Sequence, residues 1–173
     1  MGPSDRFALD EITSEQRRAL GALPLRLHVA PGVLAFHATP TDDNLYLLEE
    51  IESGHLLRGR PEGISERLGD VPARLVLCGH SHRPDIVRLT GGPVILNPGS
   101  VGCPAYKDTT HVSESGSPHA RYAMVEDRPD GAFSLELIAV SYDHEAAARR
   151  AEANDRPEWA YGLRTGFMAA LLQ

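Results

Sequence analysis

The chain has 173 residues, a formal net charge of −7, and an ordinary composition with 42% hydrophobic and 24% charged residues. This composition does not favour disorder, and the negative charge disfavours general nucleic-acid binding, which needs a basic stripe. No apolar run approaches the roughly 20 residues of a membrane span, and the 2 cysteines do not predict a disulfide framework. We therefore expect a cytoplasmic location and no membrane partner.

The first predicted elements are a helix and a pair of strands. The helix covers Thr13–Leu23, where Thr13 or Ser14 can cap its N-terminus. The strands Leu25–Ala30 and Val33–Phe36 follow, joined by a Pro-Gly pair that favours a hairpin turn. The second strand is apolar without alternation, as is typical of strands that are buried on both faces.

Two helices and a buried strand are predicted next. Asn44–Ile51 and Pro61–Leu68 have helical character, and Asp42-Asp43 is interpreted as the N-cap of the first of these helices. Leu75–Cys78 is a second uninterrupted apolar run and is predicted to be a buried strand.

The rest of the chain is predicted to contain two hairpins, a loop and two helices. The hairpin strands are Ile86–Leu89 with Val94–Leu96, and Arg121–Val125 with Phe133–Val140. Lys107–Pro118 is rich in Ser, Thr and Gly and predicts a mobile loop. The helices are Glu145–Ala153 and Glu158–Leu172. Strands in hairpins with peripheral helices indicate one α/β or α+β domain over residues 1–173.

Histidines follow both of the uninterrupted apolar strands. His37 comes directly after Val33–Phe36, and His80 and His82 come after Leu75–Cys78. Side chains two residues apart in an extended segment point the same way, and neutral imidazole is a good ligand for zinc, manganese, iron or nickel. Because ligands of open α/β sheets bind at the carboxyl ends of the strands, these three histidines are candidate metal ligands. The alternative is that they are ordinary loop histidines.

The strand Val94–Leu96 ends in the turn Asn97-Pro98-Gly99-Ser100. A Pro-Gly turn can present backbone N–H groups to an anion, so Asn97 and Ser100 are candidate substrate-binding residues. The alternative is a tight structural turn in which the asparagine caps its own backbone.

These motifs together resemble a known family. GHSH (Gly79–His82) and NPGS (Asn97–Ser100), with the strand and histidine of GVLAFHATP (Gly32–Pro40), are similar to the second half of the calcineurin-like metallophosphoesterases, in particular the small bacterial phosphoesterases and phosphatases. The resemblance runs from about Leu20 to Gly166. It implies an α/β fold that is the C-terminal part of a four-layer α/β/β/α sandwich.

The resemblance also implies an activity. In the intact protein, two divalent metal ions (Mn, Fe, Zn or Ni) would activate a water that hydrolyses a phosphomonoester or phosphodiester in a small phosphorylated substrate. His37 and His80 would bind one ion, and His82 the other.

The chain also departs from the family. The N-terminal motifs D-x-H, G-D and G-N-H-[DE] do not occur ahead of Phe36. The resemblance therefore implies that this chain supplies only the C-terminal half of the site, is inactive alone, and either self-associates or pairs with the missing N-terminal part. Two alternatives stay open: a non-catalytic scaffold, binding module or inactive fragment, and a protein that binds one metal ion through the three histidines.

Overall fold

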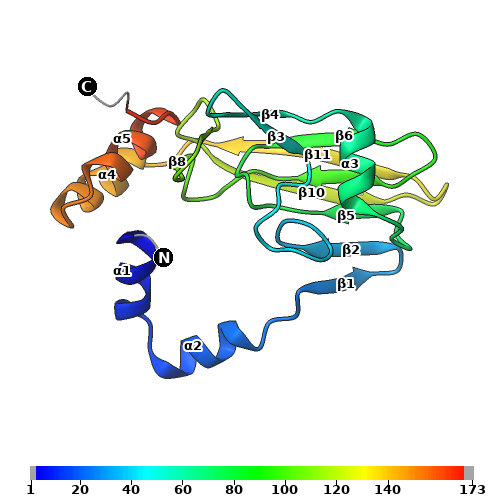
Figure 1. Ribbon diagram of the computed structural model, residues 1–173, viewed down its shortest axis with the longest axis horizontal. Helices are drawn as coiled ribbons and strands as arrows, with labels where there is room; N and C mark the ends of the chain where they lie inside the picture. Colours follow the sequence, from blue (N-terminus) through cyan, green and yellow to red (C-terminus); the bar gives the residue numbers. More distant parts are fainter. Residues whose placement is uncertain (1–2, 170–173) are drawn as a thin grey trace.

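The computed structural model describes residues 3–169, and its largest sheet has five strands in the order β1-β2-β5-β7-β6 (Figure 1). The three central strands run parallel to one another, and they are β2 (Val33–Phe36), β5 (Leu75–Leu77) and β7 (Val94–Asn97). The edge strands β1 (Arg26–Ala30) and β6 (Asp85–Arg88) are antiparallel to their neighbours. The carboxyl ends of the parallel strands therefore meet at one edge of the sheet. Both hairpins predicted here, β1–β2 and β6–β7, are confirmed.

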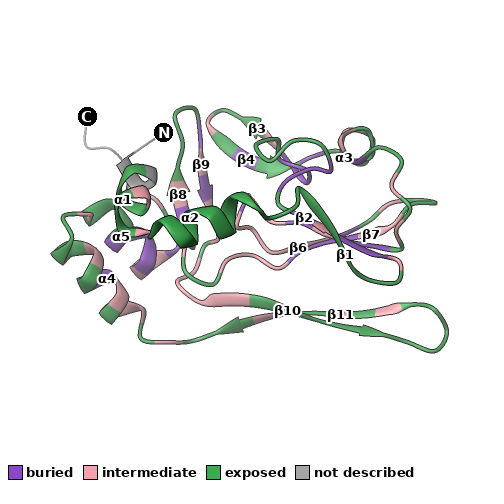
Figure 2. Ribbon diagram, turned by 90° about the horizontal axis from the view of Figure 1, so that it is seen from below, coloured by how far each residue is buried: buried purple, intermediate pink, exposed green. Residues whose placement is uncertain are grey.

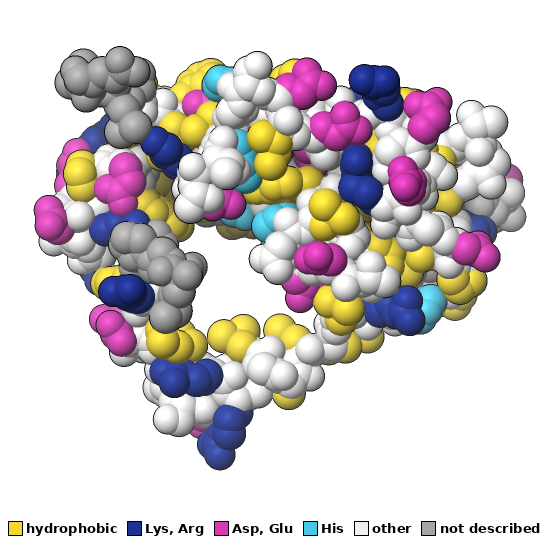
Figure 3. Space-filling view, in the orientation of Figure 1, with side chains coloured by type: hydrophobic (Ala, Val, Ile, Leu, Met, Phe, Trp, Pro, Cys, Tyr) yellow, Lys and Arg dark blue, Asp and Glu magenta, His cyan; other side chains and the backbone are white. Residues whose placement is uncertain are grey.

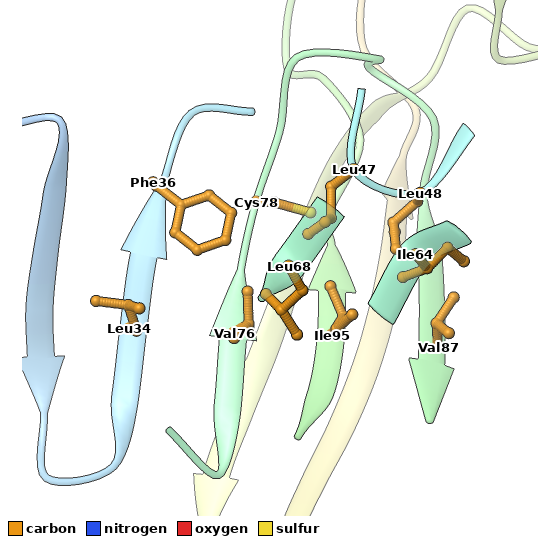
Figure 4. Close-up of a cluster of buried hydrophobic side chains, with 10 residues drawn as sticks. All are labelled: Leu34, Phe36, Leu47, Leu48, Ile64, Leu68, Val76, Cys78, Val87 and Ile95. Atoms are coloured by element: carbon orange, nitrogen blue, oxygen red, sulfur yellow. The ribbon is translucent and has the colours of Figure 1, made fainter. Parts of the chain in front are cut away.

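One face of this sheet is covered by helix α3 (Pro61–Leu68), whose predicted bounds are confirmed. Figure 4 shows the cluster of buried side chains between them: Leu34, Phe36, Leu47, Leu48, Ile64, Leu68, Val76, Cys78, Val87 and Ile95. Complete burial of one such aliphatic side chain is worth about 1.5–3 kcal/mol. This apolar layer fixes the strands whose ends carry the histidines.

The opposite face is covered by a ribbon of two antiparallel strands, β10 (Ala120–Asp127) and β11 (Phe133–Val140), which confirms the hairpin predicted there. Sheet and ribbon meet through Val33, Leu75, Leu96, Ala123, Phe133, Leu135 and Leu137. The layers are thus helix, sheet and ribbon, which confirms a mixed α/β fold. Tyr122 and Met124, which point away from the sheet, are 43% and 57% exposed. Figure 2 shows β10 and β11 largely in the colour of exposed residues.

A second sheet of four short strands has the order β3-β4-β9-β8. The strands are β3 (Glu49–Glu52), β4 (His55–Arg58), β8 (Ala105–Lys107) and β9 (Val112–Glu114). The helix predicted over Asn44–Ile51 is therefore wrong. Four consecutive residues from Tyr46 to Glu49 are buried, which one face of a helix cannot achieve. Tertiary burial here overrides the helical preference of Leu and Glu.

The interpretation of Lys107–Pro118 as a mobile loop is also wrong in part, because β8 ends and β9 lies within it. His111 and Ser113 are only 5% and 1% exposed. Polar side chains can be buried in this segment because they hydrogen-bond to one another and to the backbone. A polar strand of this kind has no apolar alternation by which it could be recognised.

Four further helices lie at the ends of the chain: α1 (Pro3–Glu11), α2 (Ser14–Gly21), α4 (His144–Ala153) and α5 (Pro157–Thr165). Of the two candidate caps, Thr13 is the one that caps α2, and it forms a capping box with Gln16. Helix α5 ends earlier than predicted, at Gly166 with a φ of 74°, and residues 170–172 of the predicted helix lie outside the described residues.

The N-terminal helices form an arm that leaves the body of the molecule at β1. Figure 3 shows an opening between this arm and the rest of the chain, and α2 contains no buried residue. None of the helices within residues 3–169 combines the length and the apolar character that crossing a bilayer requires.

Candidate metal centre

His37 and His80 are brought into contact at the carboxyl ends of the adjacent strands β2 and β5. The backbone N–H of Gly79 donates a hydrogen bond of 2.8 Å to the carbonyl of His37, which ties the two loops together. The Nε2 atom of His37 lies 3.1 Å from Nδ1 of His80, and the ring centroids are 4.9 Å apart. The loop that carries His80 also carries His82.

Two backbone carbonyls determine which ring nitrogens of His80 and His82 carry protons. Nε2 of His80 lies 3.2 Å from the carbonyl oxygen of Asn44, and Nδ1 of His82 lies 2.9 Å from that of Cys103. A carbonyl oxygen only accepts hydrogen bonds, so both of these nitrogens are protonated donors. Nδ1 of His80 and Nε2 of His82 are then left with lone pairs, and Nε2 of His37 donates to the first of them.

The surroundings favour the neutral imidazole. Burial lowers the pKa of His80, and the neighbouring His37 ring lowers it further. Burial also lowers the pKa of His82, with a smaller contribution in the same direction from His37. Neutral imidazole is the form that binds metal ions.

The positions of the ring nitrogens suit metal binding. Those of His37 and His80 can bind one ion together, and the nitrogen of His82 can bind another. Two nitrogens bound to one ion at about 2.1 Å lie roughly 3.0–3.4 Å apart, which includes the 3.1 Å between His37 and His80. Ligating histidines usually donate their other N–H to a carbonyl or carboxylate, as His80 and His82 do. Within residues 3–169, however, no three His, Cys, Asp or Glu side chains are arranged to hold one ion. This disfavours the single-ion site considered from the sequence.

The backbone of the loop that carries His80 and His82 is strained. Their φ angles are 65° and 59°, in the left-handed region that non-glycine residues seldom occupy. Ser81 lies between them and is 0% exposed. Its hydroxyl donates to Oε1 of Glu49 at 2.6 Å and accepts from Nδ2 of Asn97 at 3.0 Å. The strained loop is thus anchored at its centre by two buried side chains that bond to the Ser81 hydroxyl, and by a third, Ser113, whose hydroxyl donates to the Ser81 carbonyl.

The ring of His80 is also held by a tyrosine that stacks on it. Tyr46 stacks on the His80 ring at a centroid distance of 4.4 Å, and its hydroxyl lies 2.7 Å from both the Tyr106 hydroxyl and Nε2 of His111. Tyr106 donates to the carbonyl of His80 at 3.1 Å. Since each hydroxyl has one proton, the bonds run in one direction, from His111 through Tyr46 and Tyr106 to His80.

Asn97 is fully buried and uses its side chain within the protein. It donates to the carbonyl of Gly79 at 2.9 Å and accepts from the N–H of Gly99 at 3.0 Å. Of the two roles considered for Asn97, these bonds serve the structural turn. The hydroxyl of Ser100 accepts a bond of 3.0 Å from the N–H of Cys103, and contact of Ser100 with substrate stays a prediction.

Sequence reasoning missed most of the residues around the histidines. Glu49 and Tyr46 fall in the segment that was predicted to be helical, and Tyr106 and His111 in or beside the predicted loop. The interpretation of Asp42 as a helix cap is wrong, because its carboxylate accepts from the N–H of Asn44 at 2.7 Å and forms a local turn.

Comparison with known proteins finds only distant likeness. No model of a protein family matches the chain, and no curated protein matches it. Among solved structures, a double mutant of Vps29 from Entamoeba histolytica is 18% identical with a TM-score of 0.31, over 56% of this chain and 54% of that one. A single mutant of the same protein is 19% identical with a TM-score of 0.29, over 56% and 62% of the two chains. This chain thus spans less than two thirds of the length of either structure. Likeness at this level does not assign a function.

Proposed function

We propose that this chain contributes the histidine ligands of a two-ion, metal-dependent phosphoesterase centre. His37 through Nε2 and His80 through Nδ1 would hold one divalent ion, and His82 through Nε2 the other. The observation that carries the proposal is the 3.1 Å separation of the first two nitrogens at the carboxyl ends of adjacent parallel strands. The GHSH and NPGS motifs, at the spacing typical of calcineurin-like metallophosphoesterases, support it.

The residues of this chain orient the site. The carbonyls of Asn44 and Cys103 hold the His80 and His82 rings so that their lone-pair nitrogens are available. The bound ions (Mn, Fe, Zn or Ni) would supply an activated water and neutralise charge on the phosphoryl group. Ser100 and the backbone N–H groups of its turn are the groups that we propose for binding the phosphate of a small phosphorylated substrate.

The metal ligands that this chain offers are neutral imidazoles, and this limits the catalytic activity that we expect of the chain alone. Two divalent ions held close together repel one another strongly in a site of low dielectric constant, and a bridging carboxylate offsets this repulsion. No Asp or Glu completes such a set with the histidines within residues 3–169. We therefore propose that turnover requires acidic ligands from outside the described residues, and that this chain alone does not hydrolyse phosphate esters.

Two experiments test this proposal. The first translates the coding DNA upstream of the Met1 codon, where in-frame D-x-H, G-D and G-N-H-[DE] motifs are expected. The second assays the longer product with bis-p-nitrophenyl phosphate and Mn²⁺. Turnover that depends on the metal and is lost in His80→Ala, but kept in the control His28→Ala on exposed strand β1, supports the proposal. Turnover that is unchanged in His80→Ala contradicts it.

A further inference from the structure

Glu49 is a buried carboxyl group that reaches from one sheet into the histidine loop of another. It lies in β3, is 6% exposed, and accepts a hydrogen bond of 2.6 Å from the hydroxyl of Ser81. Ser81 is itself fully buried and lies between His80 and His82. Glu49 thus links the small second sheet to the loop that carries His80 and His82.

The loop needs such an anchor because its backbone is unfavourable. The left-handed conformation is unfavourable for any residue other than glycine, and both His80 and His82 adopt it. Backbone strain of this kind persists only where the surroundings fix it. Glu49 and Asn97 both bond to the Ser81 hydroxyl, so they fix the one residue that links the two strained positions.

We propose that Glu49 is a positioning residue for His80 and His82, acting through Ser81 to hold the two imidazoles in the orientation in which they bind metal ions. This inference rests on the proposed function, because it assumes that the histidines are ligands. It adds a residue from β3 that no motif contains, and it predicts that metal affinity depends on a side chain that does not touch metal.

A purely structural role is less consistent with the chemistry of this residue. Desolvation by burial raises the pKa of Glu49 to about 6, with a smaller contribution in the same direction from Asp85, against the lowering effects of the Ser81 hydrogen bond and the charges of Arg83 and Arg67. A buried carboxylate thus costs folding free energy at neutral pH, and apolar residues packed in place of buried charges are often neutral or stabilising. A polar side chain is nevertheless kept at this position, which is consistent with a need for a side-chain oxygen that accepts the hydrogen bond of the Ser81 hydroxyl.

The neighbourhood of Glu49 allows the side chain to be removed. A polar hollow of about 200 Å³ lies beside it, lined by Glu49, Arg58, Arg83, Pro84 and Asp85. Water can fill the space left by a smaller residue in such a polar and open place. Glu49→Ala is therefore expected to fold, and thermal unfolding of each variant checks this.

The test is a titration of the purified chain with Co²⁺, followed by visible absorption, in the wild type, Glu49→Ala and Glu49→Gln. Glu49→Ala is expected to weaken Co²⁺ binding by about 10–100-fold, the usual effect of losing a residue that orients metal ligands. Glu49→Gln keeps an oxygen that accepts from Ser81 and is expected to remain within about threefold of the wild type. Glu50→Ala, which removes the next carboxylate along the strand, paired with Arg67 at 3.5 Å, is the control and is expected to change nothing.

A double-mutant cycle then tests the route through Ser81. If Glu49 acts through this hydroxyl, adding Glu49→Ala to Ser81→Ala weakens binding by no more than about threefold further. The positioning role is overturned if the losses of Co²⁺ affinity in Glu49→Ala and Ser81→Ala multiply in the double variant. It is also overturned if Glu49→Gln and Glu49→Ala lose equal Co²⁺ affinity. If the wild type shows no Co²⁺ absorption band, the proposed function fails before the role of Glu49 is reached.

Discussion

The Nε2 atom of His37 and the Nδ1 atom of His80 lie 3.1 Å apart, although 42 residues separate the two histidines in the sequence. The contact arises because β2 and β5 are adjacent and parallel, so that the loops after them meet. Across this distance Nε2 of His37 donates a hydrogen bond to Nδ1 of His80. The same spacing suits two ligands of one ion, so metal binding requires little rearrangement of these rings.

The first prediction concerns the stacked tyrosine. Tyr46→Phe keeps a ring over His80 but leaves the partly buried hydroxyl of Tyr106 and the buried Nε2 of His111 without their shared partner. An unsatisfied buried polar group costs about 1–3 kcal/mol, so the free energy of unfolding should fall by roughly that amount in urea denaturation. Tyr161→Phe, at a position that is 42% exposed, is the control and should change it by less than about 0.5 kcal/mol. Equal stability of Tyr46→Phe and wild type would show that this hydrogen-bonded chain is not formed.

The second prediction is a pH dependence of stability that belongs to Glu49. Its pKa is raised from an ordinary value of 4.5 to about 6, so between these pH values the folded state binds more protons than the unfolded state. The stability that this group contributes is present below pH 4.5 and is lost as the pH rises through 6. Each pKa unit corresponds to about 1.4 kcal/mol, so the loss is about 2 kcal/mol.

The measurement compares the wild type with Glu49→Gln, which cannot titrate. The difference in free energy of unfolding between the two proteins should shift in favour of the glutamine variant by about 2 kcal/mol between pH 4.5 and pH 7. A difference that is constant over this range would mean that the Glu49 carboxyl is not desolvated in the folded protein.

The third prediction is that the chain associates through β1. All five residues of this edge strand are exposed, and Leu27 and Val29 are 54% and 50% exposed. Unpaired apolar strand edges recruit other chains. Light scattering should give a mass above 18.8 kDa for the wild type, and a lower mass for Leu27→Lys.

The control for the edge strand is Leu57→Lys. Leu57 is 45% exposed but lies in β4, which is paired on both sides by β3 and β9. This substitution should leave the mass of the wild type unchanged. If the wild type is a monomer at all concentrations tested, association through β1 is excluded.

The elements that could be predicted are those whose own residues determine them. The runs Val33–Phe36 and Leu75–Cys78 are apolar throughout because they fill the centre of a covered sheet, and this burial is visible in the sequence. The histidines after them could therefore be expected to meet at one sheet edge. The cap of α2 could be narrowed to Thr13 or Ser14 because capping depends on residues only three positions away, and the structure has Thr13.

The elements that could not be predicted depend on distant partners. Leu48 and Glu49 favour a helix locally, but both side chains are buried, and strand β3 begins at Glu49 instead. His111 reads as a loop residue because its partner, Tyr46, lies 65 positions away. The network around the histidines is built from such pairs, and no spacing in the sequence indicates them.

The fourth prediction follows from the donors that the chain offers. Alone, it should show no Mn²⁺-dependent hydrolysis of p-nitrophenyl phosphate, because no carboxylate completes a metal site with the histidines within the described residues. The assay is read against the metal-free chain and against His80→Ala. Metal-dependent turnover by the 173-residue chain that is lost in His80→Ala would show that it carries a complete catalytic site.

The central claim, that the three histidines bind metal, is tested most directly by isothermal titration of the chain with Zn²⁺. We expect saturable binding that His37→Ala and His80→Ala each weaken by at least about tenfold, since each removes one of two ligands of the same ion. His82→Ala should abolish a separate and weaker Zn²⁺-binding step, and His28→Ala should bind Zn²⁺ as the wild type does. Absence of saturable Zn²⁺ binding to the folded wild-type chain, or binding that all three substitutions leave unchanged, would contradict the claim.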